Sequence, residues 1–213
     1  MSDIVKLKEM TGAGMMDCKK ALEESGGDLE KAAAVLREKG KAAAVKKQDR
    51  IAAEGACFSY VHLGGKIAVV VEINCETDFA AKSDAFQDLG KNIAMHIAAY
   101  SPKYINESEV PVAELEQEKE ILRNKALNEK KPSAVIEKML EGQVKKYYAE
   151  ISLLHQQYVV DPSKTVGDVV VETIAAIGEK ISVRRFVRYE MGEGLEKKQE
   201  NFAEEVAKVT AKK

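Results

Sequence analysis

Two short stretches of alternating apolar residues, separated by a pair of glycines, restrict the possible folds of this chain more than any other feature. The first stretch runs from Gly55 to Leu63, and Gly64-Gly65 supplies a turn. Apolar residues then occupy every second position of the next stretch: Ile67, Val69, Val71 and Ile73. A period of two is typical of a β-strand, and a short glycine connection is typical of a hairpin. The pattern predicts a β-hairpin at residues 55–73.

The fifty residues before this hairpin are helical in pattern. Gly12 and Gly26-Gly27 divide them into three short helices. Asp28 can cap the third helix, and Gly40 stands just past its expected end. The apolar positions fall at helical spacings: Ile4, Leu7, Cys18, Ala21, Leu22, Leu29, Ala32, Ala33 and Leu36. These residues predict a small three-helix bundle, followed by an alanine- and lysine-rich linker that ends near residue 50.

The segment after the hairpin contains a clear helical stripe. Its apolar residues recur at spacings of three, four and seven: Phe86, Leu89, Ile93, His96, Ile97 and Tyr100. We expect this helix to lie against the hairpin. A charged helix from Val112 to Leu127, a break near Pro132 and a further helix from Ile136 to Leu154 predict a helical hairpin at about residues 112–155. This helical hairpin is expected to project from the core.

The last third of the chain returns to the sheet. Thr165-x-x-Asp168 resembles a capping box at the start of a helix that Gly178 ends. A strand pattern from Ile181 to Tyr189 follows, and a charged amphipathic helix is expected from Leu195 to about Lys208. The predicted fold class is therefore α+β, with helices on a small antiparallel sheet and a short C-terminal helix.

These elements also predict the domain organisation. Residues 1–50 would form the helical domain and its linker. Residues 51–192 would form the α+β core domain, which carries the helical hairpin. Residues 193–213 would form a C-terminal helical module.

The composition excludes several classes of function. The 33 basic and 35 acidic residues are mixed along the chain and leave a formal net charge of −2, so no broad positive field is expected to hold a nucleic acid. No apolar run reaches the roughly 18 residues of a membrane-spanning helix, and Met1-Ser2-Asp3 does not open an apolar signal segment. Three widely spaced cysteines without a C-x-x-C pair indicate reduced thiols. We expect a cytoplasmic protein without direct nucleic-acid or membrane partners.

Motifs for catalysis or cofactor binding are sparse. Gly12-Ala13-Gly14 is followed by two methionines rather than the Gly-Lys-Ser/Thr of a phosphate-binding loop. The histidines lack a histidine or cysteine one helical turn away, which leaves a zinc site unsupported: His62, His96 and His155. Cys75, Asp78 and His96 nominally supply a thiol nucleophile and a base, so a thiol enzyme is kept as a rival hypothesis. We expect no enzyme activity, no metal and no cofactor.

Two segments carry a resemblance to a known family. They read Thr-Gly-Ala-Gly-Met-Met-Asp-Cys-Lys-Lys-Ala-Leu at residues 11–22 and Glu-Ile-Asn-Cys-Glu-Thr-Asp-Phe at residues 72–79. Both resemble signatures of the elongation factor Ts family. Shorter matches follow in the family's order at residues 93–99, 162–166 and 184–186, so the resemblance covers essentially the whole chain. It implies an N-terminal domain similar to ubiquitin-associated three-helix modules, an α+β core and a short C-terminal helix.

The resemblance also implies a function that composition and periodicity do not show. Family members accelerate GDP release from elongation factor Tu, so the expected partner is this GTPase in its GDP-bound and nucleotide-free states. The turn Thr77-Asp78-Phe79 would be the working tip. Phe79 would act as a wedge, and Asp78 would meet polar groups near the switch region and help to dislodge the magnesium shell. By residue type alone, Phe79 could instead belong to the core and Asp78 could cap a helix.

Four further residues are assigned to the partner surface by the resemblance: Met15, Met16, Lys19 and His96. His96 would face the phosphate-loop side of the GTPase, although its place on an apolar stripe is also typical of a core histidine. Met15 and Met16 cannot both face inward on a helix, because neighbouring residues lie about 100° apart. With Lys19 they would contact a helix of the GTPase; core methionines and a solvated lysine are the alternatives. The helix from Leu195 would be a second clamp or an ordinary solvated helix.

The chain departs from the family pattern in three places. Ala80 stands where many members have valine, which predicts a slightly smaller tip. One compact core stands where longer members carry two, so we expect a homodimer to supply the missing half. Val187 stands where some short members have a cysteine, so the dimer would depend on packing and not on a disulfide. A ubiquitin-associated-like adaptor is the rival binding hypothesis, but it leaves the chain after the N-terminal bundle unexplained.

Overall fold

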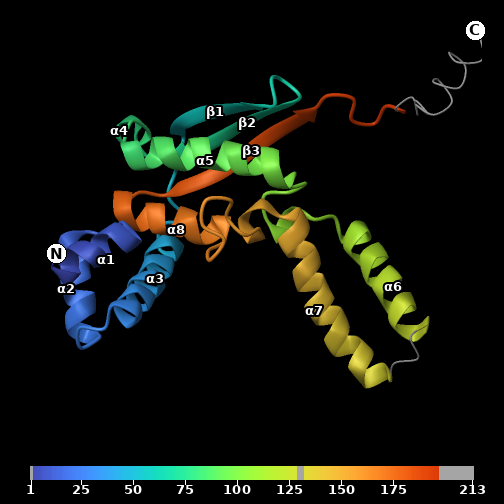
Figure 1. Cartoon of the computed structure of the whole chain (residues 1–213), viewed down its shortest axis with the longest axis horizontal. Helices are drawn as coiled ribbons and strands as arrows, with labels where there is room; N and C mark the ends of the chain where they lie inside the picture. The colour runs from blue at the N-terminus through green and yellow to red at the C-terminus, as the bar shows by residue number, and fades with distance from the viewer. Residues whose placement is uncertain (1, 129–131, 197–213) are drawn as a thin grey trace, which may run out of the picture.

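A three-stranded antiparallel sheet forms the centre of the fold (Figure 1). The computed structural model describes residues 2–128 and 132–196. The strands lie in the order β1-β2-β3, with the bounds Glu54–His62, Ile67–Cys75 and Ile181–Glu190. Phe58 of β1 lies opposite Val71 of β2, and β3 pairs with the other edge of β2. The predicted hairpin is therefore confirmed, and the predicted late strand completes the sheet beside it.

Helix α5 (Asp84–Tyr100) covers one face of this sheet. The Ser83 hydroxyl oxygen begins the helix by accepting the Phe86 N–H at 3.4 Å. The alternating residues of β2 and the stripe of α5 meet in one core: Val69, Val71, Ile73, Phe86, Leu89, Ile93 and Ile97. Gly90 lets the Phe58 ring approach the α5 backbone, because a Cβ there would overlap the ring. The predicted packing of this helix on the hairpin is confirmed.

Helix α8 (Val166–Ile177) packs against α5 and β3, and its other side contacts α3 (Leu29–Val45). A capping box begins α8: Thr165 Oγ1 accepts the Asp168 N–H at 3.0 Å, and Asp168 Oδ2 accepts the Thr165 N–H at 3.1 Å. Gly178 ends the helix with a φ of 85°, in the left-handed region that favours glycine. Both predicted ends of this helix are confirmed.

The N-terminal helices pack around their own apolar cluster. They are α1 (Asp3–Thr11), α2 (Met15–Glu24) and α3, and their buried residues are Leu7, Cys18, Ala21, Leu22, Ala32 and Leu36. Asp28 caps α3 by accepting two N–H groups of its first turn. The predicted end of this helix at Gly40 is wrong, because α3 continues to Val45. Gly40 is buried where α3 meets α8, and a Cβ there would lie 3.5 Å from the Cβ of Ala175. Gly40 therefore lies inside the helix, at its contact with α8, and does not end it.

Helices α6 (Val112–Asn128) and α7 (Ser133–Ile151) project away from the sheet, as predicted (Figure 1). They contact each other through a small buried cluster: Ala126, Ile136 and Leu140. A carboxylate fastens their base to the core, because Glu114 accepts the Tyr104 hydroxyl at 2.6 Å and the Tyr147 hydroxyl at 2.7 Å. The helical hairpin is thus held at its base.

The prediction that the helix of this hairpin extends to Leu154 is wrong. Helix α7 ends at Ile151, and the Leu154 N–H bonds to the Ile105 carbonyl of the core at 3.0 Å. Two short 3₁₀ turns occur at Glu107–Glu109 and Leu153–His155. Most of the expected helix from Leu195 to about Lys208 lies outside the described residues.

The fold class predicted from the sequence, α+β, is confirmed. The division at residues 1–50, 51–192 and 193–213 stays a prediction. Within the described ranges, no helix has both the length and the apolar character needed to cross a bilayer.

Candidate partner-binding site

Strand β2 leads directly into a single helical turn at one end of the long axis of the molecule (Figure 1). This turn is α4 (Asp78–Ala81), and Thr77 is its N-cap: the Thr77 Oγ1 accepts the Ala80 N–H at 3.2 Å. Ala80 and Ala81 are buried in the core shared by the sheet and α5. The expectation that Ala80 makes the tip smaller is therefore wrong, because Ala80 faces the core and not the outer surface.

Phe79 points the other way and is 83% exposed. The alternative that it belongs to the hydrophobic core is wrong. Single exposed apolar side chains are common on proteins, so exposure alone indicates no function. Phe79 is distinctive because the backbone that carries it is held in place: the next two residues, Ala80 and Ala81, are buried, and Thr77 caps the turn. Phe79 is therefore a projecting aromatic on a firmly held turn.

Asp78 is exposed beside Phe79 and forms an ion pair with Lys82, at 2.7 Å between Oδ2 and Nζ. The hydrogen bond from Lys82 and its positive charge lower the pKa of Asp78 below the ordinary value, so this carboxyl is ionised at neutral pH. Asp78 stands in the first turn of α4, and the cap is Thr77. The alternative that Asp78 is the helix cap is therefore wrong.

The turn is also braced by residues that are distant in sequence. Glu179 accepts the Thr77 N–H at 3.0 Å and the Thr77 hydroxyl at 2.7 Å. Glu76 accepts the Lys180 N–H at 2.6 Å and pairs with Arg50 at 3.3 Å. Sequence reasoning missed Glu179 and Glu76, because a bond between residues about a hundred positions apart leaves no local pattern.

Cys75 and His96 do not form the nucleophile and base of a thiol enzyme. The buried Cys75 Sγ donates to the Thr77 carbonyl at 3.1 Å, and burial raises the pKa of this thiol. His96 is also buried, and both of its ring nitrogens have protein partners: Nδ1 accepts the Val159 N–H at 3.2 Å, and Nε2 lies 2.9 Å from Gln156 Oε1. The Cys75 thiol and the His96 ring therefore each form hydrogen bonds with other residues.

The same contacts correct the expectation that His96 contacts a partner. Because Nδ1 accepts a hydrogen bond, Nε2 carries the proton and donates it to Gln156. Burial lowers the pKa of His96, so its ring is neutral at neutral pH. Its ring also stacks on Tyr100, with centroids 4.6 Å apart. His96 is a satisfied core histidine, which is the alternative that its apolar stripe had indicated.

The methionines expected at the partner surface lie at the start of α2. Both are exposed, Met15 by 46% and Met16 by 65%, so neither is a core residue. Lys19 lies one turn further along and approaches Glu23 at 3.9 Å. Helices α2 and α4 lie towards the same end of the molecule (Figure 1). The structure therefore leaves the apolar start of α2 and the projecting Phe79 free at one end.

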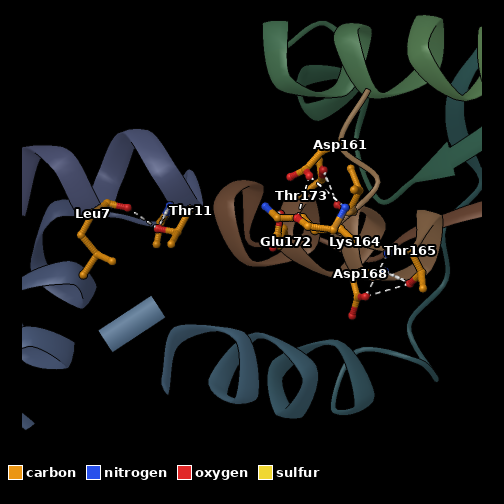
Figure 2. A network of polar contacts seen from close by, with 11 residues as sticks. Leu7, Thr11, Asp161, Lys164, Thr165, Asp168, Glu172 and Thr173 are labelled. Carbon is orange, nitrogen blue, oxygen red and sulfur yellow. Dashed lines mark hydrogen bonds and ion pairs between the residues drawn. The ribbon is translucent and has the colours of Figure 1, made fainter. Parts of the chain in front are cut away.

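A separate cavity of about 370 Å³ lies where α1 and α3 meet α8 and the loop before it. Figure 2 shows the polar side chains on the α8 side, where Lys164 pairs with Glu172 at 2.8 Å close to Asp161. Arg37 lines the cavity from α3. Charges of both signs compensate one another here, so this cavity offers no excess positive charge to select a phosphate group. Within residues 2–128 and 132–196, no three His, Cys, Asp or Glu side chains cluster to hold a metal ion.

Comparison with known proteins relates these features to a family. The family model described as Elongation factor TS matches residues 3–193. The chain belongs to the elongation factor Ts family. Elongation factor Ts of Desulforamulus reducens is 61% identical over 206 residues, which cover 97% of this chain and 95% of that protein. Elongation factor Ts of Acetivibrio thermocellus is 59% identical, with coverage of 96% and 95%. Elongation factor Ts of Geobacter sulfurreducens is 58% identical, with coverage of 97% and 95%.

Membership of this family implies nucleotide exchange on elongation factor Tu during translation elongation. It confirms the family that the two sequence signatures predicted. Of the segments that carried the resemblance, residues 11–22 run from the end of α1 into α2, and residues 72–79 run from the end of β2 into α4. The signature segments thus include the exposed Met15, Met16 and Phe79 at one end of the fold.

Proposed function

We propose that this chain promotes GDP release from elongation factor Tu by inserting the Asp78-Phe79 tip and disturbing the magnesium and phosphate site. The observation that supports the proposal is the exposed Phe79 on a capped turn whose next two residues are buried. An aromatic side chain on a rigid turn can act as a wedge, because the turn keeps its position when the side chain contacts the partner. The exchange takes place in the bacterial cytoplasm and requires no catalytic residue.

The exchange follows from competition between two ligands of one GTPase. If the factor and GDP favour different states of elongation factor Tu, each weakens the binding of the other by the same factor. Every tenfold weakening of GDP binding represents about 1.4 kcal/mol of differential binding by the factor. The tip therefore needs to bind the GDP-free state better, and no covalent bond has to form or break.

Asp78 contributes a negative charge to the same event. Its lowered pKa keeps the carboxylate ionised, and its partner Lys82 is itself exposed. An exposed ion pair of this kind is weak, so the carboxylate can leave Lys82 for polar groups of the partner. Near the switch region, such a carboxylate helps to displace the groups that hold the magnesium shell.

The start of α2 supplies a second contact with the GTPase. Met15 and Met16 are exposed side by side, and methionine adapts its flexible side chain to an apolar partner surface. Lys19 lies on the same helix and can pair with an acidic group of the partner. Two separated contacts at one end of the molecule fix the orientation in which Phe79 meets the nucleotide site.

On the face of the sheet opposite α5, the described residues leave apolar side chains exposed, which supports a homodimer. Residues of this face alternate with those beneath α5, and several are exposed and apolar: Val61, Val70, Val187 and Tyr189. Val70 of β2 lies opposite Val187 of β3, so the apolar residues form a continuous patch across the strands. A second copy can cover the patch by symmetric packing, without a disulfide.

Light scattering on the purified chain tests the dimer. The expected mass is about twice the 23.4 kDa of one chain, and Val187→Glu is expected to lower it to that of one chain, because a buried carboxylate is costly. A wild-type mass of a single chain would exclude the dimer. The mass is measured over a range of concentrations, because association depends on the protomer concentration.

Release of fluorescent GDP from a bacterial elongation factor Tu tests the proposed function directly. The labelled complex is mixed with excess unlabelled GDP, and the release rate is measured at increasing concentrations of the chain. We expect the rate to rise with concentration and then to saturate. Release at the intrinsic rate throughout would refute the proposal. Binding of the GTPase without acceleration would instead favour the adaptor hypothesis.

A further inference from the structure

We propose that Glu179 is a positioning residue for the exchange tip: its carboxylate holds Thr77 and, through Thr77, the helical turn that presents Phe79. The inference rests on the proposed function of the tip. It adds a residue from a different part of the chain, since Glu179 stands 102 positions after Thr77. Glu179 does not adjoin Phe79 in sequence, and its action would be exerted entirely through the geometry of the turn.

The contact between Glu179 and Thr77 uses both oxygens of the carboxylate. Oε2 accepts the Thr77 N–H at 3.0 Å, and Oε1 accepts the Thr77 hydroxyl at 2.7 Å. Two simultaneous hydrogen bonds to a charged acceptor fix both the backbone and the side chain of one residue. Thr77 therefore has a defined rotamer and a defined peptide orientation at the point where α4 begins.

The Thr77 hydroxyl passes this constraint to α4. Its proton is donated to Glu179, and its oxygen accepts the Ala80 N–H at 3.2 Å. Donation to a carboxylate polarises the hydroxyl and strengthens it as an acceptor for the helix. Glu179 thus supports the cap of the one turn that carries Phe79, and the loss of Glu179 would leave the Thr77 hydroxyl free to rotate.

The segment that carries Glu179 is itself well anchored. Gly178 ends α8, and β3 begins at Ile181, which pairs with Cys75 at the end of β2. The two turns are bonded reciprocally, because Lys180 N–H donates to Glu76 at 2.6 Å while Glu179 accepts from Thr77. These reciprocal bonds hold Glu179 in place. The turn between α8 and β3 therefore supports the tip, and we call this turn and its contacts the brace.

The linker from the N-terminal helices joins the same brace. Lys180 Nζ donates to the carbonyl oxygens of Gln48 at 2.6 Å and Arg50 at 2.9 Å. The Arg50 guanidinium group also reaches Glu76 at 3.3 Å. Glu179 bonds to Thr77, and the Lys180 N–H and the Arg50 guanidinium group bond to Glu76. Thr77 and Glu76 are the two residues that precede Asp78. The brace therefore acts where β2 passes into the tip.

The test is a double-mutant cycle on GDP release from elongation factor Tu at saturating concentration of the chain. We expect Glu179→Ala to slow release about tenfold, a change of about 1.4 kcal/mol. Glu179→Gln keeps the volume and one acceptor oxygen, so a smaller loss is expected. The matched control is Glu190→Ala, which removes an exposed carboxylate that is paired with Arg188. We expect this control to release GDP at the wild-type rate.

The double variant separates positioning from general effects. If Glu179 acts through Phe79, then Phe79→Ala with Glu179→Ala should release GDP within about twofold of the rate of Phe79→Ala alone. Fully additive losses would overturn the inference. Slow release by Phe79→Ala together with wild-type release by Glu179→Ala would overturn the inference and leave the tip function standing. Wild-type release by Phe79→Ala would instead refute the function of the tip.

Amide hydrogen exchange of the free chain gives a readout that does not depend on the GTPase. Glu179→Ala is expected to accelerate exchange of the Thr77 and Ala80 amides at least several-fold, while the amides of α5 keep their wild-type rates. Unchanged exchange at both amides would overturn the positioning role. Faster exchange across α5 as well would mean a general loss of stability and would also count against it.

Discussion

Truncation of Phe79 to alanine is the most direct test of the exchange tip. An aromatic side chain buries about 150–250 Å² when it is enclosed, and 83% of Phe79 is accessible to a partner. Enclosing this fraction is worth a gross of about 3–5 kcal/mol at about 25 cal/mol/Å². Alanine keeps the Cβ, and association consumes part of the remainder. The expected net loss is about 2–3 kcal/mol, which slows GDP release about 30- to 150-fold.

The same structure predicts that the variant folds normally. Phe79 contributes almost nothing to the core, whereas Ala80 and Ala81 of the same turn are buried. The melting temperature of Phe79→Ala should therefore stay within about 2 °C of wild type, since surface changes are usually worth less than about 0.5 kcal/mol. Thermal unfolding followed by circular dichroism checks this part of the prediction.

The assay compares two truncations of exposed apolar residues. Release of fluorescent GDP is followed with wild type, Phe79→Ala and the control Val112→Ala, whose side chain is 75% exposed at the start of the projecting α6. We expect the control to match wild type. The reasoning is refuted if Phe79→Ala accelerates release as well as wild type does, or if Val112→Ala slows release equally.

Two further predictions concern stability. Gly40→Ala should raise the melting temperature, because a Cβ at Gly40 meets Ala175 at an ordinary 3.5 Å and alanine favours a helix over glycine by about 0.5–1 kcal/mol. Gly90→Ala should lower the melting temperature, because a Cβ at Gly90 overlaps the Phe58 ring. The opposite order in thermal unfolding would contradict both packing arguments. Burial lowers the pKa of His96 below its ordinary 6.5 in the folded chain. His96 therefore binds a proton more readily in the unfolded chain, and the free energy of unfolding should fall as the pH drops below about 6.5. Urea unfolding at pH 7.5 and 5.5 should show a larger fall for wild type than for His96→Gln; equal falls would exclude His96 as the source.

Much of the fold could be predicted because it depends on local periodicity. The alternation of β2 and the stripe of α5 each mark a buried face, and both faces meet in the core. The capping box at Thr165 and Asp168 and the glycine at 178 are similarly local signals, and both ends of α8 followed from them. These features need only the residues within one or two turns.

The errors arose where distant contacts decide the outcome. A glycine is typical of a helix end, but Gly40 lies inside α3, where this helix packs on α8. His96 was assigned to a partner surface by family resemblance, whereas its own stripe indicated burial. For Phe79 the opposite held, because residue type indicated burial and the structure exposes the side chain. Periodicity was therefore a reliable guide for His96 on a long helix, whereas residue type was a poor guide for Phe79 on a single turn.

The shortness of α4 explains why its surroundings matter for exchange. One helical turn is unstable alone, because fixing its backbone dihedrals costs more than its few hydrogen bonds return. The buried Ala80 and Ala81, the Thr77 cap and the Glu179 carboxylate must therefore hold the turn in place. If a lost support left the presented conformer populated one-tenth of the time, binding of the tip would weaken tenfold without any change in Phe79. Exchange activity should thus depend on the supports of the turn as well as on the wedge itself.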